Sequence, residues 1–167
     1  MAAEDVVNGL QRHLFADEQQ DTYAIIDGAS APGLLDLLAE HEPEHTCLFS
    51  GELHPEVEQM APYLVRLEAH SALSQVVFEK GWGKHWGIFA MLPADMRFID
   101  VRKHFRTFLR VRSPDGKPLL FRYYDPRVLR VYLPTCNDEE TATIFGPVNS
   151  YLLESEDASV ALRFLPG

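Results

Sequence analysis

The sequence predicts a single α/β domain, in which helices flank a largely parallel central sheet and an antiparallel hairpin lies toward the C-terminus. The first observation is the run from Thr22 to Asp27, which is apolar almost throughout, as in strands buried on both faces. The second is the helical pattern after it, because Ser30 and Pro32 suit a helix start. A strand, a turn and a helix in this order form the first half of a βαβ crossover. The third is the length of 167 residues, which fits one core over residues 1–167.

Hydrophobic periodicity predicts the other elements in order. Residues 5–16 have apolar side chains at helical spacing, and an acidic link after them completes an N-terminal segment of residues 1–21. Further strands are expected at 45–49, 63–67, 86–92, 148–153 and 159–164, the last within a C-terminal segment of residues 155–167. Further helices are expected at 71–80, 96–108, 126–133 and from Asp138 to Gly146. The pattern does not assign the order of the strands.

A hairpin is expected just before the helix at 126–133. Pro114-Asp115-Gly116 is a strong turn signal, and it joins a half-exposed strand at 109–112 to an alternating strand at 118–124. That second strand runs straight into the helix, where Asp125 suits the N-cap and Pro126 the first helical position.

This junction is the most polar part of an otherwise apolar region. It gathers the side chains of Arg122, Tyr124, Asp125 and Arg127. One interpretation is structural, with Asp125 capping its helix and pairing with a nearby arginine. The other interpretation is a corner that binds a partner.

The charge of the chain is unevenly distributed. The net charge is −10, but residues 97–130 hold ten basic and three acidic side chains, whereas the rest holds five basic and 22 acidic ones. A basic segment in an acidic protein can dock an acidic partner. Alternatively, the two parts attract each other within the molecule, or the arginines form a solvated face. The acidic remainder would repel phosphates, so no nucleic-acid partner is expected.

Three features predict a cytoplasmic protein. No apolar run approaches the roughly 20 residues that span a bilayer, so no membrane partner is expected. The N-terminus has Glu4 and Asp5 where a signal peptide would be basic, so no leader is expected. Cys47 and Cys136 are far apart in sequence, and unpaired thiols in a reducing compartment are favoured over a disulfide.

Three local patterns resemble chemical motifs but lack an essential part. His41-Glu42-Pro43-Glu44-His45 has the letters of a zinc-protease helix, but Pro43 argues against a continuous helix. Gly28 and Gly33 have phosphate-loop spacing without the required lysine. The glycine-rich stretch 81–87 lies between a helix and a strand, the reverse of the order in a dinucleotide site.

The stretch 81–87 has two other interpretations. It can be a tight turn that lets Trp82 and Trp86 pack, or it can expose a tryptophan as an interface anchor. No spacing of serine, histidine and acid marks a catalytic triad. We therefore expect no enzyme, no cofactor and no metal.

Five short motifs, taken together, resemble the DUF4123 family over residues 22–154. They are Tyr23-Ala24-Ile25-Ile26-Asp27, Ala61-Pro62-Tyr63-Leu64-Val65, Trp86-Gly87-Ile88-Phe89, Phe121 to Leu129, and Phe145-Gly146-Pro147-Val148. The resemblance implies a non-catalytic bacterial adaptor, or effector chaperone, of the type VI secretion system. Such a protein would hold a toxic effector and help to load it onto the VgrG-type spike.

The family pattern transfers no functional residues to this chain, so the site is a hypothesis drawn from its own residues. The candidate partner-binding residues are Arg110, Arg112, Arg122, Tyr124, Asp125, Arg127, Trp82 and Trp86. One competing interpretation is a small-molecule- or nucleotide-binding α/β protein, with its pocket at the strand ends near Asp27 and Gly28. Another is a small hydrolase with an unmarked site.

Overall fold

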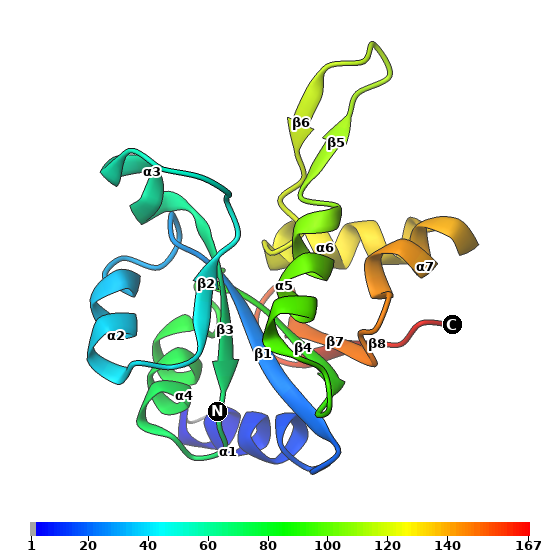
Figure 1. Cartoon of the computed structure of the whole chain (residues 1–167). Coiled ribbons are helices and arrows are strands. Elements are labelled where there is room, and N and C mark those ends of the chain that lie inside the picture. Colours follow the sequence, from blue (N-terminus) through cyan, green and yellow to red (C-terminus); the bar gives the residue numbers. More distant parts are fainter. Residues whose placement is uncertain (1–2) are drawn as a thin grey trace.

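The computed structural model describes residues 3–167, in which a six-stranded sheet lies between two layers of helices (Figure 1). The sheet has the order β2-β3-β1-β4-β7-β8. Its strands are β1 (Gln20–Asp27), β2 (His45–Cys47), β3 (Pro62–Leu67), β4 (Gly87–Pro93), β7 (Ser150–Glu154) and β8 (Ala161–Phe164). A second sheet consists of β5 (Arg110–Arg112) and β6 (Pro118–Leu120). Met1 and Ala2, in the N-terminal segment 1–21, lie outside the described residues.

The expectation of a largely parallel sheet is wrong, because every pair of neighbouring strands is antiparallel. The crossover expected after β1 does exist, since β1 and β2 run in the same direction. However, β3 lies between them, and β1 similarly lies between β3 and β4. The two parallel strands joined by each crossover are thus not neighbours, because an antiparallel strand lies between them. The two-sided burial of β1 indicates helices on both faces, and this burial is the same for either strand direction.

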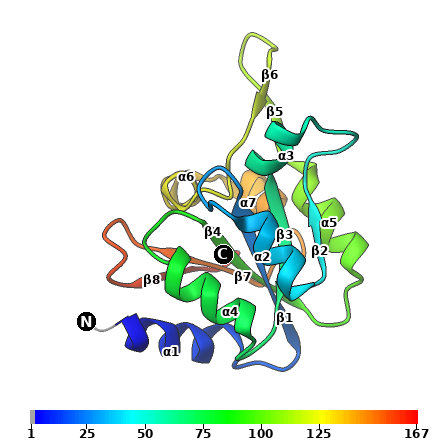
Figure 2. The same cartoon turned by 90° about the vertical axis from the view of Figure 1, so that its left-hand side faces the viewer.

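Alternate residues of β1 enter two separate cores. Ala24 and Ile26 face α1 (Ala3–Leu14), α2 (Leu34–His41) and α4 (Ala72–Val76), which cover one face (Figure 2). Tyr23 and Ile25 face α5 (Phe98–Thr107), α6 (Pro126–Tyr132) and α7 (Asp138–Phe145) on the other. The prediction of helices on both faces of the sheet is therefore confirmed.

The remaining helical segments are short. They are α3 (Pro55–Met60), a π-helical turn after α4 (Val77–Gly81) and a 3₁₀ turn after α6 (Leu133–Thr135). The helix expected at 71–80 is thus a short α-helix followed by a wider turn.

The hairpin exists, but its second strand is shorter than expected. β6 ends at Leu120, whereas the alternating pattern predicted a strand to residue 124. Tyr123 and Tyr124 are both buried, although alternation would place them on opposite faces. Tyr123 leaves the strand because its hydroxyl donates a hydrogen bond to the Phe105 carbonyl at 2.8 Å. Packing against α5 therefore ends the strand.

Candidate interaction surface

The carboxylate of Asp27 organises the turn at the end of β1. This side chain is 1% exposed, and it accepts hydrogen bonds from the Ala29 N–H at 3.0 Å and the Ser30 hydroxyl at 3.2 Å. It also accepts one from the guanidinium of Arg122, which follows the hairpin. Arg122 therefore pairs with a carboxylate that the sequence did not single out as its partner.

Asp125 caps α6 and also forms the second ion pair of this region. Its Oδ1 accepts from the Arg127 N–H at 2.9 Å and from Arg127 Nε at 3.0 Å, and its Oδ2 accepts from Arg127 Nη2 at 2.9 Å. Burial acts to raise the pKa of the Asp125 carboxyl, but the hydrogen bonds from Arg127 outweigh it and hold the pKa below its ordinary value. The capping role expected from the sequence is confirmed.

Tyr124 lies beside the Arg122 guanidinium and is 2% exposed. The Arg122 guanidinium carbon is 5.9 Å from the centroid of its ring. Burial, and next the negative charge of Asp27, raise the pKa of Tyr124 to about 12. The Tyr124 hydroxyl therefore stays protonated at neutral pH.

The expected polar corner thus forms, and Asp27 joins it. We use polar corner for Asp27, Arg122, Tyr124, Asp125 and Arg127 together. Both carboxylates in it are at least 94% buried, whereas the Arg122 and Arg127 side chains are 44% and 51% exposed. Each arginine already has a carboxylate partner. The Arg122–Asp27 pair joins the segment after the hairpin to the end of β1, and the Arg127–Asp125 pair stabilises the start of α6.

Trp82 and Trp86 pack into the protein. Trp86 is 8% exposed, and the indole N–H of Trp82 donates to the Ala158 carbonyl at 2.9 Å. A Cβ at Gly81 would lie 2.9 Å from the Trp86 ring, so the backbone approaches the ring this closely only because residue 81 is glycine. The tight-turn interpretation fits this arrangement.

The sequence interpretation missed Glu154, a buried acid beside this turn. Glu154 is 3% exposed, and its Oε1 accepts from the Gly83 N–H at 3.1 Å. Its Oε2 lies 3.4 Å from His85 Nδ1. Burial raises the pKa of Glu154 above its ordinary value, although Gly83 and His85 oppose the shift. The available signal was its position, because Asp27 and Glu154 are both acids that end a buried strand.

The basic segment 97–130 divides into two groups of cations. Arg97, Lys117, Arg122 and Arg127 each have a carboxylate partner. The other six have none within residues 3–167: Arg102, Lys103, Arg106, Arg110, Arg112 and Arg130. Arg110 lies over the Phe49 ring at 5.6 Å, and Arg112 Nη1 donates to the Gly116 carbonyl at 2.9 Å. Internal charge pairing therefore explains part of the segment, and the cations that it leaves without a carboxylate include the two arginines of β5.

These two arginines lie on a hairpin that projects from the molecule at the end opposite α1 (Figures 1 and 2). All six residues of β5 and β6 are exposed, including Val111, Leu119 and Leu120 at 39%, 50% and 38%. Val111 and Leu119 are cross-strand partners and share one face. Arg110 and Arg112 lie on the other face. A two-stranded ribbon is at most marginally stable alone, so it gains stability if a partner covers it.

An open hollow of about 330 Å³ lies beside the turn after β1, as the small-molecule interpretation would require. Its lining is Gly28, Ala29, Ala31, Pro32, Gly33, Leu34, Leu35, Asp36, Gln59 and Met60. The nearby Asp27 carboxylate is already bonded to Ala29, Ser30 and Arg122. In addition, β3 and β4 begin where β1 ends, so carboxyl ends of neighbouring strands do not converge there. This end of β1 therefore lacks the converging carboxyl ends of parallel strands at which a pocket was expected.

The apparent zinc motif is divided between two elements. α2 ends at His41, and His45 begins β2. Among residues 3–167, no three side chains of His, Cys, Asp or Glu come together as metal ligands would.

The fold and this surface define the chain as an α/β domain with an antiparallel sheet, a closed polar corner and a projecting basic hairpin. Residues 22–143 match the family model described as Domain of unknown function (DUF4123). The chain belongs to the DUF4123 family, so the resemblance to that family is confirmed. Comparison with curated proteins and with solved structures gave no match. No helix within residues 3–167 has the length and apolarity needed to cross a membrane.

Proposed function

We propose that this protein is a non-catalytic adaptor of a bacterial type VI secretion system, acting in the cytoplasm. It binds a protein effector and helps to load that effector onto the VgrG-type spike. The observation that carries the proposal is the β5–β6 hairpin, an exposed ribbon with apolar residues on one face and Arg110 and Arg112 on the other. Membership of the DUF4123 family supports the same function, through the role that the sequence resemblance implies.

The hairpin suits a partner that must be bound and later released. Val111 and Leu119 offer a small apolar contact, which limits the affinity. Arg110 and Arg112 attract an acidic partner and speed association. Exposed charges are screened over about 8 Å at physiological salt, so this attraction weakens as salt rises. Binding of this kind selects an acidic partner and remains reversible.

Secretion by the bacterium that makes the protein tests the proposal. Deletion of its gene is expected to stop export of the toxin encoded beside the spike gene, while the tube protein of the apparatus is still exported. The toxin should also co-purify with the tagged adaptor. Normal toxin export from the deletion strain would refute the adaptor function.

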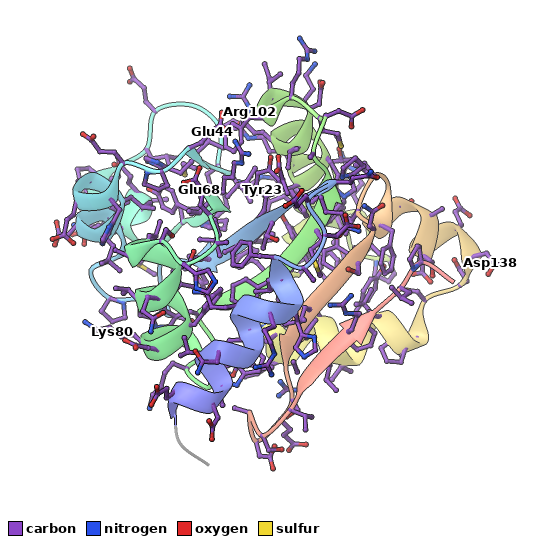
Figure 3. All side chains as sticks on the ribbon, turned by 90° about the horizontal axis from the view of Figure 1, so that it is seen from below. Tyr23, Glu44, Glu68, Lys80, Arg102 and Asp138 are labelled. Atoms are coloured by element: carbon purple, nitrogen blue, oxygen red, sulfur yellow. The ribbon has the colours of Figure 1, made fainter. Side chains whose placement is uncertain are left out.

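A charge-reversal variant tests the surface. Arg110→Glu with Arg112→Glu is expected to reduce toxin capture at least tenfold with almost no change in Tm, because both side chains are exposed. The matched control is Lys80→Glu with Lys84→Glu, which makes the same change in charge on exposed side chains elsewhere. Figure 3 shows Lys80 at the periphery of the molecule beside α4. Equal capture by both double variants would remove the hairpin from the binding surface.

A further inference from the structure

One edge of β5 has backbone groups that do not bond to β6. The hydrogen bonds at the two ends of the ribbon show which residues these are. The Phe121 N–H donates to the Leu109 carbonyl at 2.8 Å, and the Ser113 N–H donates to the Lys117 carbonyl at 2.8 Å. Bonded and non-bonded pairs alternate in an antiparallel ladder, so Val111 is the bonded residue of β5. The N–H and C=O groups of Arg110 and Arg112 therefore point away from β6.

The two edges of the ribbon are not equivalent. On β6, the outward-facing positions are Pro118 and Leu120, the partners of Arg112 and Arg110. Pro118 has no N–H, so this edge lacks a donor that an added strand would need. On β5, both outward positions have a donor and an acceptor. The edge of β5 is therefore the one on which a third strand can form.

We propose that an extended acidic segment of the protein partner adds to β5 as a third strand. The segment has the pattern acid, apolar, acid. Residues opposite Arg110 and Arg112 lie on the same face as these arginines, so carboxylates there form ion pairs with them. The residue between them lies on the face of Val111 and Leu119, and it extends this apolar strip. The inference rests on the proposed function, because the segment belongs to the effector that the adaptor carries.

The positive charge of β5 favours an acidic segment of the partner as the added strand. Arg110 and Arg112 are cations without a carboxylate partner in the described part of the chain. A second copy of β5 would place arginine opposite arginine, which is unfavourable. Both side chains are exposed, so an acidic segment can reach them.

A synthetic peptide tests the inference with the full chain. The probe is fluorescein-labelled Glu-Val-Glu-Val-Glu-Val-Glu, and its control has glutamine in place of glutamate. Fluorescence anisotropy should show at least tenfold tighter binding of the acidic peptide. Arg110→Glu with Arg112→Glu should weaken that binding at least tenfold, while Lys80→Glu with Lys84→Glu should leave it within twofold. Equal binding of the two peptides would overturn the inference.

A pair of variants at one position separates strand addition from simple charge attraction. Arg112→Gln removes the charge and keeps the outward N–H, whereas Arg112→Pro removes both. Both changes remove the hydrogen bond from Arg112 Nη1 to the Gly116 carbonyl, so that loss is matched between them. Neither change removes a backbone hydrogen bond of the ribbon, because residue 112 is in a non-bonded pair. Strand addition predicts that Arg112→Pro binds the acidic peptide at least fivefold more weakly than Arg112→Gln. Equal affinities would show attraction by charge alone and would overturn strand addition.

Hydrogen exchange locates the new strand. The amides of Arg110 and Arg112 should become protected at least fivefold when the acidic peptide binds, and that of Leu120 should not. Absence of this protection would also overturn the inference. Displacement of the peptide by single-stranded DNA at equal concentration would overturn it as well.

If the peptide does not bind but the toxin is still captured, this inference is wrong and the adaptor function stands. If the peptide adds to β5 but toxin export is independent of the protein, the adaptor function falls and the edge site remains.

Discussion

Arg122 donates a hydrogen bond to the buried carboxylate of Asp27, a residue 95 positions earlier in the sequence. This pair ties the base of the hairpin to the end of β1 in the central sheet. The neighbouring pair between Asp125 and Arg127 fixes the start of α6. The projecting hairpin is therefore tied at its base to the central sheet by one ion pair, although its strands are exposed. This attachment leaves the edge of β5 open to a partner.

Replacement of Arg122 by methionine should destabilise the protein by about 1–3 kcal/mol. The reason is that Asp27 stays buried and loses its cationic partner, while Ala29 and Ser30 still donate to it. Urea denaturation measures the change in the free energy of unfolding. Lys103→Met is the matched control, because Lys103 is an exposed cation of the same segment. Equal stability of the two variants would mean that the Asp27 pair contributes nothing.

Replacement of Asp125 by alanine should cost about 1–2 kcal/mol, because it removes both the N-cap and the partner of Arg127. Asp125→Asn keeps a capping oxygen and should lose about half as much. Because the folded-state pKa of Asp125 is lowered, its stabilisation is present above about pH 4 and is lost as the pH falls further. Thermal unfolding from pH 7 to pH 3 measures both effects. Equal losses for alanine and asparagine would show that capping is unimportant here.

His104 should make the stability of the fold depend on pH. It packs against Phe105 and Phe108, with ring centroids 4.9 Å and 5.1 Å away, and burial lowers its pKa from 6.5 to about 4 despite a hydrogen bond with the Ile144 carbonyl. Because the pKa of His104 is lower in the folded state, protonation of this side chain favours the unfolded state. The free energy of unfolding is therefore unaffected by His104 above about pH 6.5, and it declines by roughly 2–3 kcal/mol as the pH falls to about 4.

The difference in unfolding free energy between the wild type and His104→Gln isolates this effect from other titrating groups such as Glu154. That difference should change between pH 6.5 and pH 4 and should be constant above this range. A pH-independent difference would contradict the burial of a neutral His104.

Two glycine substitutions should have opposite effects. Gly81→Ala places a Cβ 2.9 Å from the Trp86 ring and should destabilise the protein by about 1–3 kcal/mol. Gly9→Ala meets no atom closer than 3.9 Å within α1 and should stabilise it by about 0.5–1 kcal/mol. Thermal unfolding followed by tryptophan fluorescence measures both changes. Stabilisation by Gly81→Ala would contradict the close approach of this turn to Trp86.

Local signals in the sequence predicted several features correctly. The N-cap at Asp125, the turn at Pro114-Asp115-Gly116 and the two-sided burial of β1 all follow from neighbouring residues. Four members of the polar corner were also predicted together, because they are adjacent in sequence. Its fifth member, Asp27, was not linked to them, since only folding brings residues 27 and 122 together. Glu154 was missed for the same reason, because its partners Gly83 and His85 lie far away in the chain.

The sequence by itself determined most of the helices and strands, the two covered faces of the sheet and the surplus of positive charge around the hairpin. These properties depend on hydrophobic periodicity and composition, which act over a few residues. Only the tertiary structure decided the direction of neighbouring strands, since an antiparallel strand inserted into each crossover leaves the burial pattern unchanged. It also decided which cations are paired, because Arg122 and Arg127 lie beside buried carboxylates, whereas Arg110 and Arg112 are exposed on a ribbon and form no ion pair with the described residues.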